Sequence, residues 1–154
     1  MPGRARALQA ATVVAPRIPS AAMALVDQHL DAGDLVVLTT ATNRFITELT
    51  ALYLGIEHLI ATDVESVDGC FTGRTQGTLN MREGKVTRLH AWLKARGHAL
   101  QEMESTAYSD SANDLALLGA VNHPVAVDPD PRLLAQVITR QLIREGRIVT
   151  LRIP

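Results

Sequence analysis

The sequence predicts an α/β protein of three layers, in which helices cover both faces of a parallel sheet. Short β-branched runs alternate along the chain with segments whose apolar residues recur every three or four positions. The run over residues 35–40 is continuously apolar or β-branched, which is typical of a strand buried on both faces. Strands that alternate with helices imply parallel pairing with right-handed crossovers. A chain of 154 residues is long enough for one such domain with a real core.

The same patterns place the individual elements. Met23, Val26 and Leu30 recur at helical spacing and Gly33 follows as a stop, so a helix is predicted over residues 21–30. The strand over residues 35–40 comes next. The remaining elements are predicted, in order, as a helix over 45–53, a strand over 58–62, a helix over 86–93, a strand ending at 107–108, a short helix over 115–121, a strand over 124–127, a helix over 133–143 and an edge strand over 148–151.

Two segments depart from this alternation. Residues 64–80 are polar and glycine-rich, and the pairs Asp68-Gly69 and Thr72-Gly73 are turn signals, so a hairpin excursion is predicted there. Residues 1–19 form an N-terminal arm ahead of a core that spans residues 20–154. Within the arm, residues 11–15 are short, apolar and β-branched, which makes them a candidate replacement strand.

Composition excludes several classes of function. Hydrophobic residues make up 47% and charged residues 20%, with a net charge of −1, so the chain lacks the basic footprint of a nucleic-acid binder. Cys70 is the single cysteine, which agrees with a reducing compartment and a cytoplasmic location. The histidines are scattered without the spacing of zinc ligands. No apolar run approaches the roughly 18 residues that suggest a membrane span.

Two carboxylates lie four residues apart at Asp110 and Asp114, with Asn113 beside the second. Carboxylate oxygens suit magnesium, which takes only one or two carboxylates from a protein. The alternative is that these residues form an ordinary turn and helix N-cap, and the spacing alone does not separate the two interpretations. Thr40 and Asp110 both fall at the carboxyl ends of predicted strands, which is where the ligands of parallel sheets collect. That convergence favours a functional site.

Thr40, Ala41 and Lys85 are further candidates for binding a phosphate. Thr40 ends a strand ahead of a predicted helix, so its hydroxyl and the following amides suit a phosphate oxygen, although the segment also suits a helix cap. Lys85 lies in the first turn of a predicted helix, where the macrodipole favours acidic residues. A charge at this place indicates either a solvated lysine or a group that neutralises a phosphoryl oxygen.

Taken in order, these segments resemble the haloacid dehalogenase-like hydrolases, and within them the phosphoserine-phosphatase-like branch. The similar segments are 37–45 (VLTTATNRF), 68–73 (DGCFTG), 83–86 (EGKV), 108–114 (YSDSAND) and 123–130 (HPVAVDPD). The resemblance implies a Rossmann-like core and a magnesium-dependent phosphomonoester hydrolase acting on a small phosphorylated metabolite. It further implies the roles of the site residues: Thr40 and Ala41 bind the phosphoryl group, Lys85 neutralises its charge, Asp110 ligates Mg2+, and Asn113 and Asp114 support the metal and the phosphate-binding loop.

This chain lacks the first motif of the family it resembles. The nucleophile of that family belongs to an Asp-x-Asp-x-Thr sequence, which does not occur here. The chain is therefore predicted to be an N-terminally truncated and inactive member, without the cap that selects substrate. A non-catalytic phosphate-binding module or a degenerate fragment is the alternative. An active enzyme with another nucleophile, or with one supplied by another chain, ranks last. The absence of the strand that carries this motif would leave a vacant position in the sheet. Residues 11–15 would fill that position, or the sheet would keep an unpaired edge that favours self-association.

Overall fold

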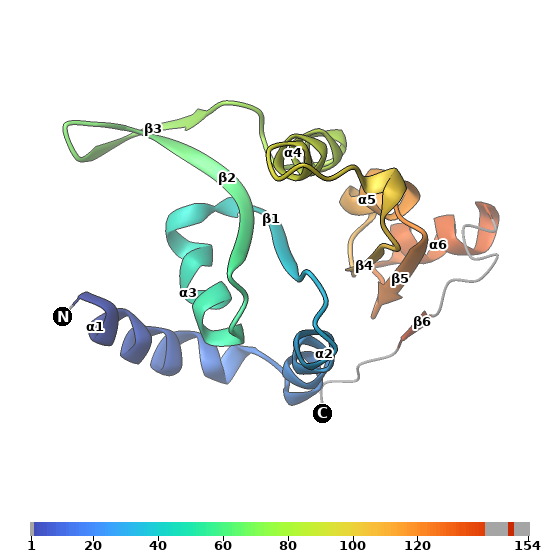
Figure 1. The fold of residues 1–154 in the computed structure, drawn as a ribbon, viewed down its shortest axis with the longest axis horizontal. Helices are drawn as coiled ribbons and strands as arrows, with labels where there is room; N and C mark the ends of the chain where they lie inside the picture. Colours follow the sequence, from blue (N-terminus) through green and yellow to red (C-terminus); the bar gives the residue numbers. More distant parts are fainter. Residues whose placement is uncertain (1, 141–147, 150–154) are drawn as a thin grey trace. The chain divides into compact units, whose positions relative to one another are not determined.

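The computed structural model describes residues 2–140 and 148–149, which divide between two compact units, one within residues 1–80 and the other within residues 81–154. Figure 1 labels their helices and strands. Each unit contains parallel strands joined through helices, so the prediction of an α/β fold with parallel strands is confirmed. The strands form two sheets of three, in the orders β1-β2-β3 and β4-β5-β6.

In the first unit, parallel strands β1 and β2 are joined by α3, and the antiparallel strand β3 extends the sheet. Asn43 caps α3, since its Oδ1 accepts a hydrogen bond from the amide of Ile46 at 3.0 Å. Gly55 ends α3 in the left-handed conformation, with φ 70°. The elements of this unit are α1 (Pro2–Gln9), η1 (Ala10–Val14), η2 (Ala15–Arg17), α2 (Ser20–Asp31), β1 (Val37–Asn43), α3 (Arg44–Leu54), β2 (His58–Val67) and β3 (Cys70–Gln76).

The predicted excursion is a hairpin made by β2 and β3, which extends away from α3 in Figure 1. Its tip is Asp68-Gly69, and both residues have positive φ, 52° and 80°. Positive φ at both central residues is the requirement of the two-residue turn that matches the twist of paired strands. A hairpin is therefore present over residues 58–76, overlapping the segment 64–80 in which an excursion was predicted, and the strand predicted over residues 58–62 continues into it.

Residues 10–14 are helical, so the replacement strand predicted over residues 11–15 is wrong. The segment continues the alanine-rich helix α1, and alanine is the strongest helix former. The hydroxyl of Thr12 donates to the carbonyl oxygen of Leu8 at 2.9 Å, a bond back along the helix that an extended chain cannot make. The arm also packs against α3, where Arg6 lies 2.7 Å from Glu48.

Strand β1 is half-buried rather than buried on both faces as its composition predicted, and Leu35 just before it is 43% exposed. Among the described residues, β1 pairs only with β2, so one edge of the strand has no neighbour. An apolar β-branched run therefore does not by itself place a strand in the middle of a sheet.

In the second unit, β4, β5 and β6 are parallel, and the core cluster is formed by Leu118, Ala126 and Leu133. This core lies directly behind the loop that follows β4, because Ala112 and Leu115 pack against it. Residues 141–143 of the predicted last helix and 150–151 of the predicted last strand lie outside the described residues. The elements are α4 (Glu83–Lys94), η3 (Leu100–Glu102), β4 (Thr106–Ser109), η4 (Ala112–Asp114), α5 (Leu115–Ala120), β5 (His123–Val127), α6 (Pro131–Arg140) and β6 (Ile148–Val149).

Candidate active site

Lys85 occupies the first turn of α4, and its side chain is buried rather than solvated, with 9% of its surface exposed. Its Nζ lies 2.7 Å from Oδ1 of Asp114, whose side chain is 13% exposed. A buried ammonium group requires a paired anion, because desolvation of an isolated charge is strongly unfavourable. The pair therefore speaks against a solvated lysine, because this side chain is held in place by a specific partner, and its role toward a phosphoryl oxygen stays a prediction.

The second oxygen of Asp114 is held as well. The hydroxyl of Ser109, the last residue of β4, donates to Asp114 Oδ2 at 2.6 Å. The same Ser109 oxygen accepts the amide of Ser111 at 3.1 Å. Ser109 is 8% exposed, so these bonds are shielded from water. Ser109 thereby links the end of β4, the loop after it and the carboxylate that holds Lys85.

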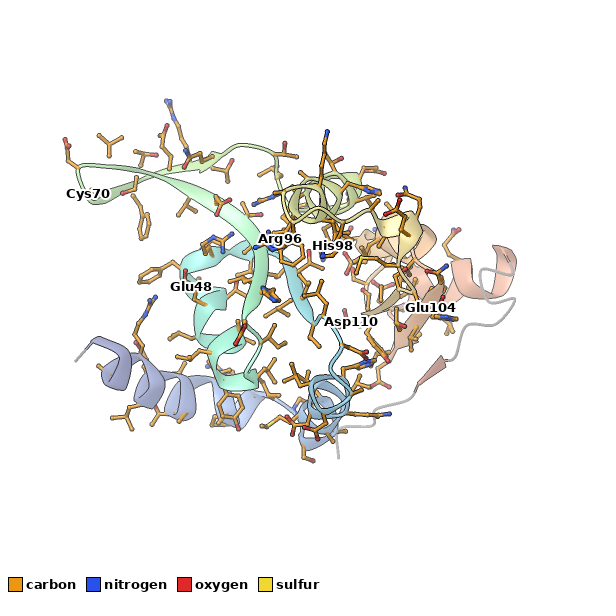
Figure 2. All side chains as sticks on the ribbon, in the orientation of Figure 1. Glu48, Cys70, Arg96, His98, Glu104 and Asp110 are labelled. Atoms are coloured by element: carbon orange, nitrogen blue, oxygen red, sulfur yellow. The ribbon has the colours of Figure 1, made fainter. Side chains whose placement is uncertain are left out.

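Asp110 follows β4 directly and is exposed, as is Asn113 three residues later. Asp110 is labelled in Figure 2. Within the described part of the chain, the Asp110 carboxylate accepts no hydrogen bond, while its backbone oxygen accepts the amide of Asp130 at 2.8 Å. The amide of Asn113 donates to Ser111 Oγ at 3.2 Å, so the short helix η4 begins with a capping turn. Ser111 therefore makes the capping turn without using the Asp110 carboxylate, and metal binding by Asp110 stays a prediction.

Asp130 organises the same loop, although no sequence pattern assigned it a role beyond membership of the similar segment 123–130. Its carboxylate accepts the amide of Leu133 at 2.7 Å and the amide of Ala112 at 3.0 Å. These backbone bonds, to Leu133 first and Ala112 second, hold the pKa of the Asp130 carboxyl below its ordinary value. One carboxylate thus caps the start of α6 and fixes the loop that carries Asp110. Its position directly before Pro131, at the start of a helix, is the sequence signal for such a cap.

Thr40 and Ala41 lie in the other unit, within β1 and ahead of α3. Thr40 Oγ1 accepts the amide of Thr42 at 3.2 Å, which folds the chain into a tight turn there. The regular pairing of β1 with β2 ends at Thr40 and resumes, shifted, at Asn43. Bulges of this kind re-aim backbone groups next to functional sites. The structure therefore brings Lys85, Asp110, Asn113 and Asp114 together in one unit, and places Thr40 and Ala41 together in the other.

Asp110 and Asp114 can supply only part of the ligands that a magnesium ion needs. The described residues contain no group of three or more histidine, cysteine or acidic side chains that could hold a metal. Of the two predicted ligands, Asp110 is free to coordinate, whereas both oxygens of Asp114 already have protein partners. Magnesium is often held by one or two carboxylates together with substrate phosphates. Asp110 can supply one of them, and direct ligation by Asp114 stays a prediction.

Comparisons with known proteins identify the family. Residues 2–119 match the model of the haloacid dehalogenase-like hydrolases. The chain is 43% identical over 125 residues to a histidinol-phosphatase of Neisseria meningitidis, covering 80% of this chain and 56% of that protein. It is 38% identical over 133 residues to a phosphoserine phosphatase of Mycobacterium tuberculosis, covering 86% and 41%. The chain thus spans about half the length of these relatives.

Solved structures agree with this result. A Bordetella pertussis protein described as of unknown function superposes with a TM-score of 0.80 and 47% identity, over 84% of this chain and 59% of that one. A substrate-bound phosphoserine phosphatase superposes with a TM-score of 0.60 and 19% identity, over 81% and 56%, which supports the fold alone. The chain belongs to the haloacid dehalogenase-like hydrolase family.

Proposed function

We propose that this chain carries the phosphate-binding and charge-neutralising part of a magnesium-dependent phosphomonoester hydrolase. The observation that carries the proposal is the buried pair of Lys85 and Asp114 at the carboxyl end of β4. A buried lysine held by one carboxylate is preorganised to stabilise negative charge on phosphoryl oxygens, which is most of what phosphoryl transfer asks of a protein. Asp110 would hold Mg2+, which would neutralise charge on the same oxygens when bound.

Thr40 and Ala41 are the residues proposed for phosphate binding in the other unit, taken by itself. The Thr40 hydroxyl and the Ala41 amide, ahead of α3, offer hydrogen-bond donors to an anion. Two relatives are named for different phosphomonoesters, so the comparisons support this class of substrate without choosing one. A small phosphorylated metabolite is the partner we propose, and with a single cysteine in the sequence we place the protein in the cytoplasm. None of the described helices is both long and apolar enough to cross a membrane.

We further propose that these 154 residues do not turn over substrate by themselves. No Asp-x-Asp-x-Thr sequence occurs among them, so the family's covalent step has no nucleophile here. In a magnesium-dependent assay with an aryl phosphate, we expect no hydrolysis above background. Turnover that disappears in Asp110→Asn would contradict this proposal and show an active enzyme.

Phosphate binding is tested separately by thermal unfolding with inorganic phosphate or vanadate. A ligand of the folded state at 100 times its Kd adds about 2.7 kcal/mol of stability, which is readily seen as a higher Tm. We expect this protection in the wild type and its loss in Thr40→Val and Lys85→Met. Lys94→Met, in the last turn of the same helix as Lys85 and exposed, is the matched control. Absence of protection in the wild type would indicate a degenerate fragment.

A further inference from the structure

Asn80 is buried, although the residues on either side of it in the sequence are exposed. It is fully buried, with 0% of its surface exposed, whereas Leu79 and Met81 on either side are 47% and 43% exposed. This reverses the usual partition, in which apolar side chains are buried and amides face water. Every residue of the preceding strand β3 is exposed as well. A polar side chain that is buried against this preference is held there by specific bonds.

Those bonds all reach residues within β1 and β2, close to the place where the pairing of the two strands changes register. Asn80 Nδ2 donates to the carbonyl oxygens of Thr40 and Ile60, each at 2.8 Å, and lies 3.0 Å from Thr39 Oγ1. The two carbonyls fix the orientation of the carboxamide, because only its NH2 group can donate to them. The backbone amide of Asn80 donates to Thr62 Oγ1 at 3.3 Å. Asn80 Oδ1 accepts no bond within the described residues, so the side chain serves as a donor.

The bonds fall where the regular pairing of β1 with β2 is interrupted. Pairing is regular up to Thr40 opposite Ala61 and resumes, shifted, at Asn43 opposite Thr62. The carbonyl of Thr40 lies at this break, immediately ahead of the turn in which Thr40 Oγ1 accepts the Thr42 amide. Ala41 and Thr42 lie in the interrupted stretch, where the ladder fixes the backbone less firmly than in regular pairing.

We propose that Asn80 is the positioning residue of the Thr40 turn: its carboxamide fixes β1 at Thr40 so that the Thr40 hydroxyl and the Ala41 amide stay arranged for a phosphoryl group. This inference rests on the proposed function, which assigns phosphate binding to Thr40. Asn80 acts through Thr40 and does not touch the ligand, because its own side chain is fully buried.

The test compares Asn80→Ala with Thr62→Val in the full chain. Thr62 is also buried and bonds to Asn80, so Thr62→Val perturbs the same place while leaving the carboxamide bonds to Thr40 intact. Two quantities are measured: amide hydrogen exchange of Ala41 and Thr42, and the Kd of inorganic phosphate by titration calorimetry.

In Asn80→Ala we expect exchange at Thr42 to rise and phosphate binding to weaken, each by about tenfold, which corresponds to about 1.4 kcal/mol. In Thr62→Val we expect changes of less than about twofold. Should Asn80→Ala fail to fold, Asn80→Ser removes the same carboxamide while its hydroxyl keeps one polar group in the buried position.

The outcomes separate the two proposals. If the wild type binds phosphate and Asn80→Ala binds it equally well, with unchanged exchange, Asn80 does not position the turn, and the proposed function stands. The inference is also overturned if Thr62→Val loses as much as Asn80→Ala, since the effect would then be general destabilisation. If the wild type does not bind phosphate, the proposed function fails, and exchange at Thr42 alone decides whether Asn80 fixes the turn.

Discussion

The ion pair between Lys85 and Asp114 joins residues 29 positions apart, and both side chains are largely buried. Replacement of Asp114 by Asn keeps the shape but leaves the Lys85 charge unpaired, which is expected to cost about 3–5 kcal/mol of unfolding free energy. The measurement is urea denaturation followed by circular dichroism. Lys85→Met combined with Asp114→Leu removes both charges and should recover most of the loss, since apolar replacements of buried pairs are often neutral. A double variant as unstable as Asp114→Asn would show that burial of charge is not the cause.

Ser109 gives a second prediction at the scale of one side chain. Ser109→Ala removes the donor to Asp114 Oδ2 and the acceptor of the Ser111 amide, both in a buried position. A hydrogen bond to a charged group contributes about 1.5–3 kcal/mol, so a loss of that size is expected in the same denaturation experiment. Ser111→Ala, whose hydroxyl accepts only an exposed amide, is the matched control and should lose under about 1 kcal/mol. Equal losses of unfolding free energy in both variants would contradict the prediction that Ser109 contributes more to stability than Ser111.

Candidate residues could be selected from the sequence by residue type and position. Burial and the bonds to residues distant in the sequence could not be predicted. Strand-end positions and acidic spacing were enough to select Thr40, Asp110 and Asp114. Burial of Lys85 was not predictable, because its partner comes from a different element and no local pattern specifies that pairing. Asn80 escaped notice for a related reason: an asparagine in a glycine-rich segment has the composition of a turn, and only the fold shows that it is buried.

Among the elements, α6 depends on Asp130, and this dependence predicts a response to pH. The pKa of Asp130 in the folded chain lies below the ordinary value of 3.8, so the charged form is favoured by folding. Its contribution to stability is present above the unfolded-state pKa and is lost as pH falls through the folded-state pKa. Asp130→Asn, which has no charge to lose, should therefore differ from the wild type most at neutral pH and progressively less below 3.8. Urea denaturation of both proteins across this pH range is the measurement, and a constant difference would contradict the prediction.

Two glycines in helical regions are expected to respond oppositely to alanine. Gly55 ends α3 with φ 70°, where a Cβ costs about 1–2 kcal/mol, so Gly55→Ala should lower the midpoint of thermal unfolding. Gly119 lies inside α5, and a Cβ built there meets no atom within 4 Å. Gly119→Ala should therefore stabilise the protein by about 0.4–1 kcal/mol. A gain from Gly55→Ala would show that the left-handed cap is not required.

Element types were largely predictable from periodicity, and the exceptions have clear physical origins. The runs beginning near Val37, His58 and His123 became strands because β-branched residues suit a pleated sheet. Thr12 and Val13 have the same composition, yet they follow an alanine-rich helix and continue it. Short apolar runs are ambiguous, and the structure on either side decides between strand and helix. Strand pairing could not be predicted either, because the sequence of β1 does not show how many neighbouring strands pair with it.

For the whole molecule, the edge of β1 that has no partner strand among the described residues predicts self-association. An edge strand exposes unpaired backbone groups that another chain can pair with, and Leu35 beside it is 43% exposed. We expect the weight-average mass in sedimentation equilibrium to rise with protein concentration. Leu35→Lys should reduce that rise, because charged residues near an edge oppose strand addition. A wild type that stays monomeric over the whole range would show that this edge is protected.

The bonds between Asn80 and the end of β1 also set an order of events during synthesis. Thr40 leaves the ribosome 40 residues before the side chain that anchors its carbonyl. Both residues pass through the same exit tunnel, so at about 5–20 residues per second Asn80 emerges about 2–8 s after Thr40. During that interval β1, α3 and β2 can assemble, but the Thr40 carbonyl stays unanchored. A nascent chain arrested before residue 80 would therefore contain the threonine of the proposed phosphate site without its anchor.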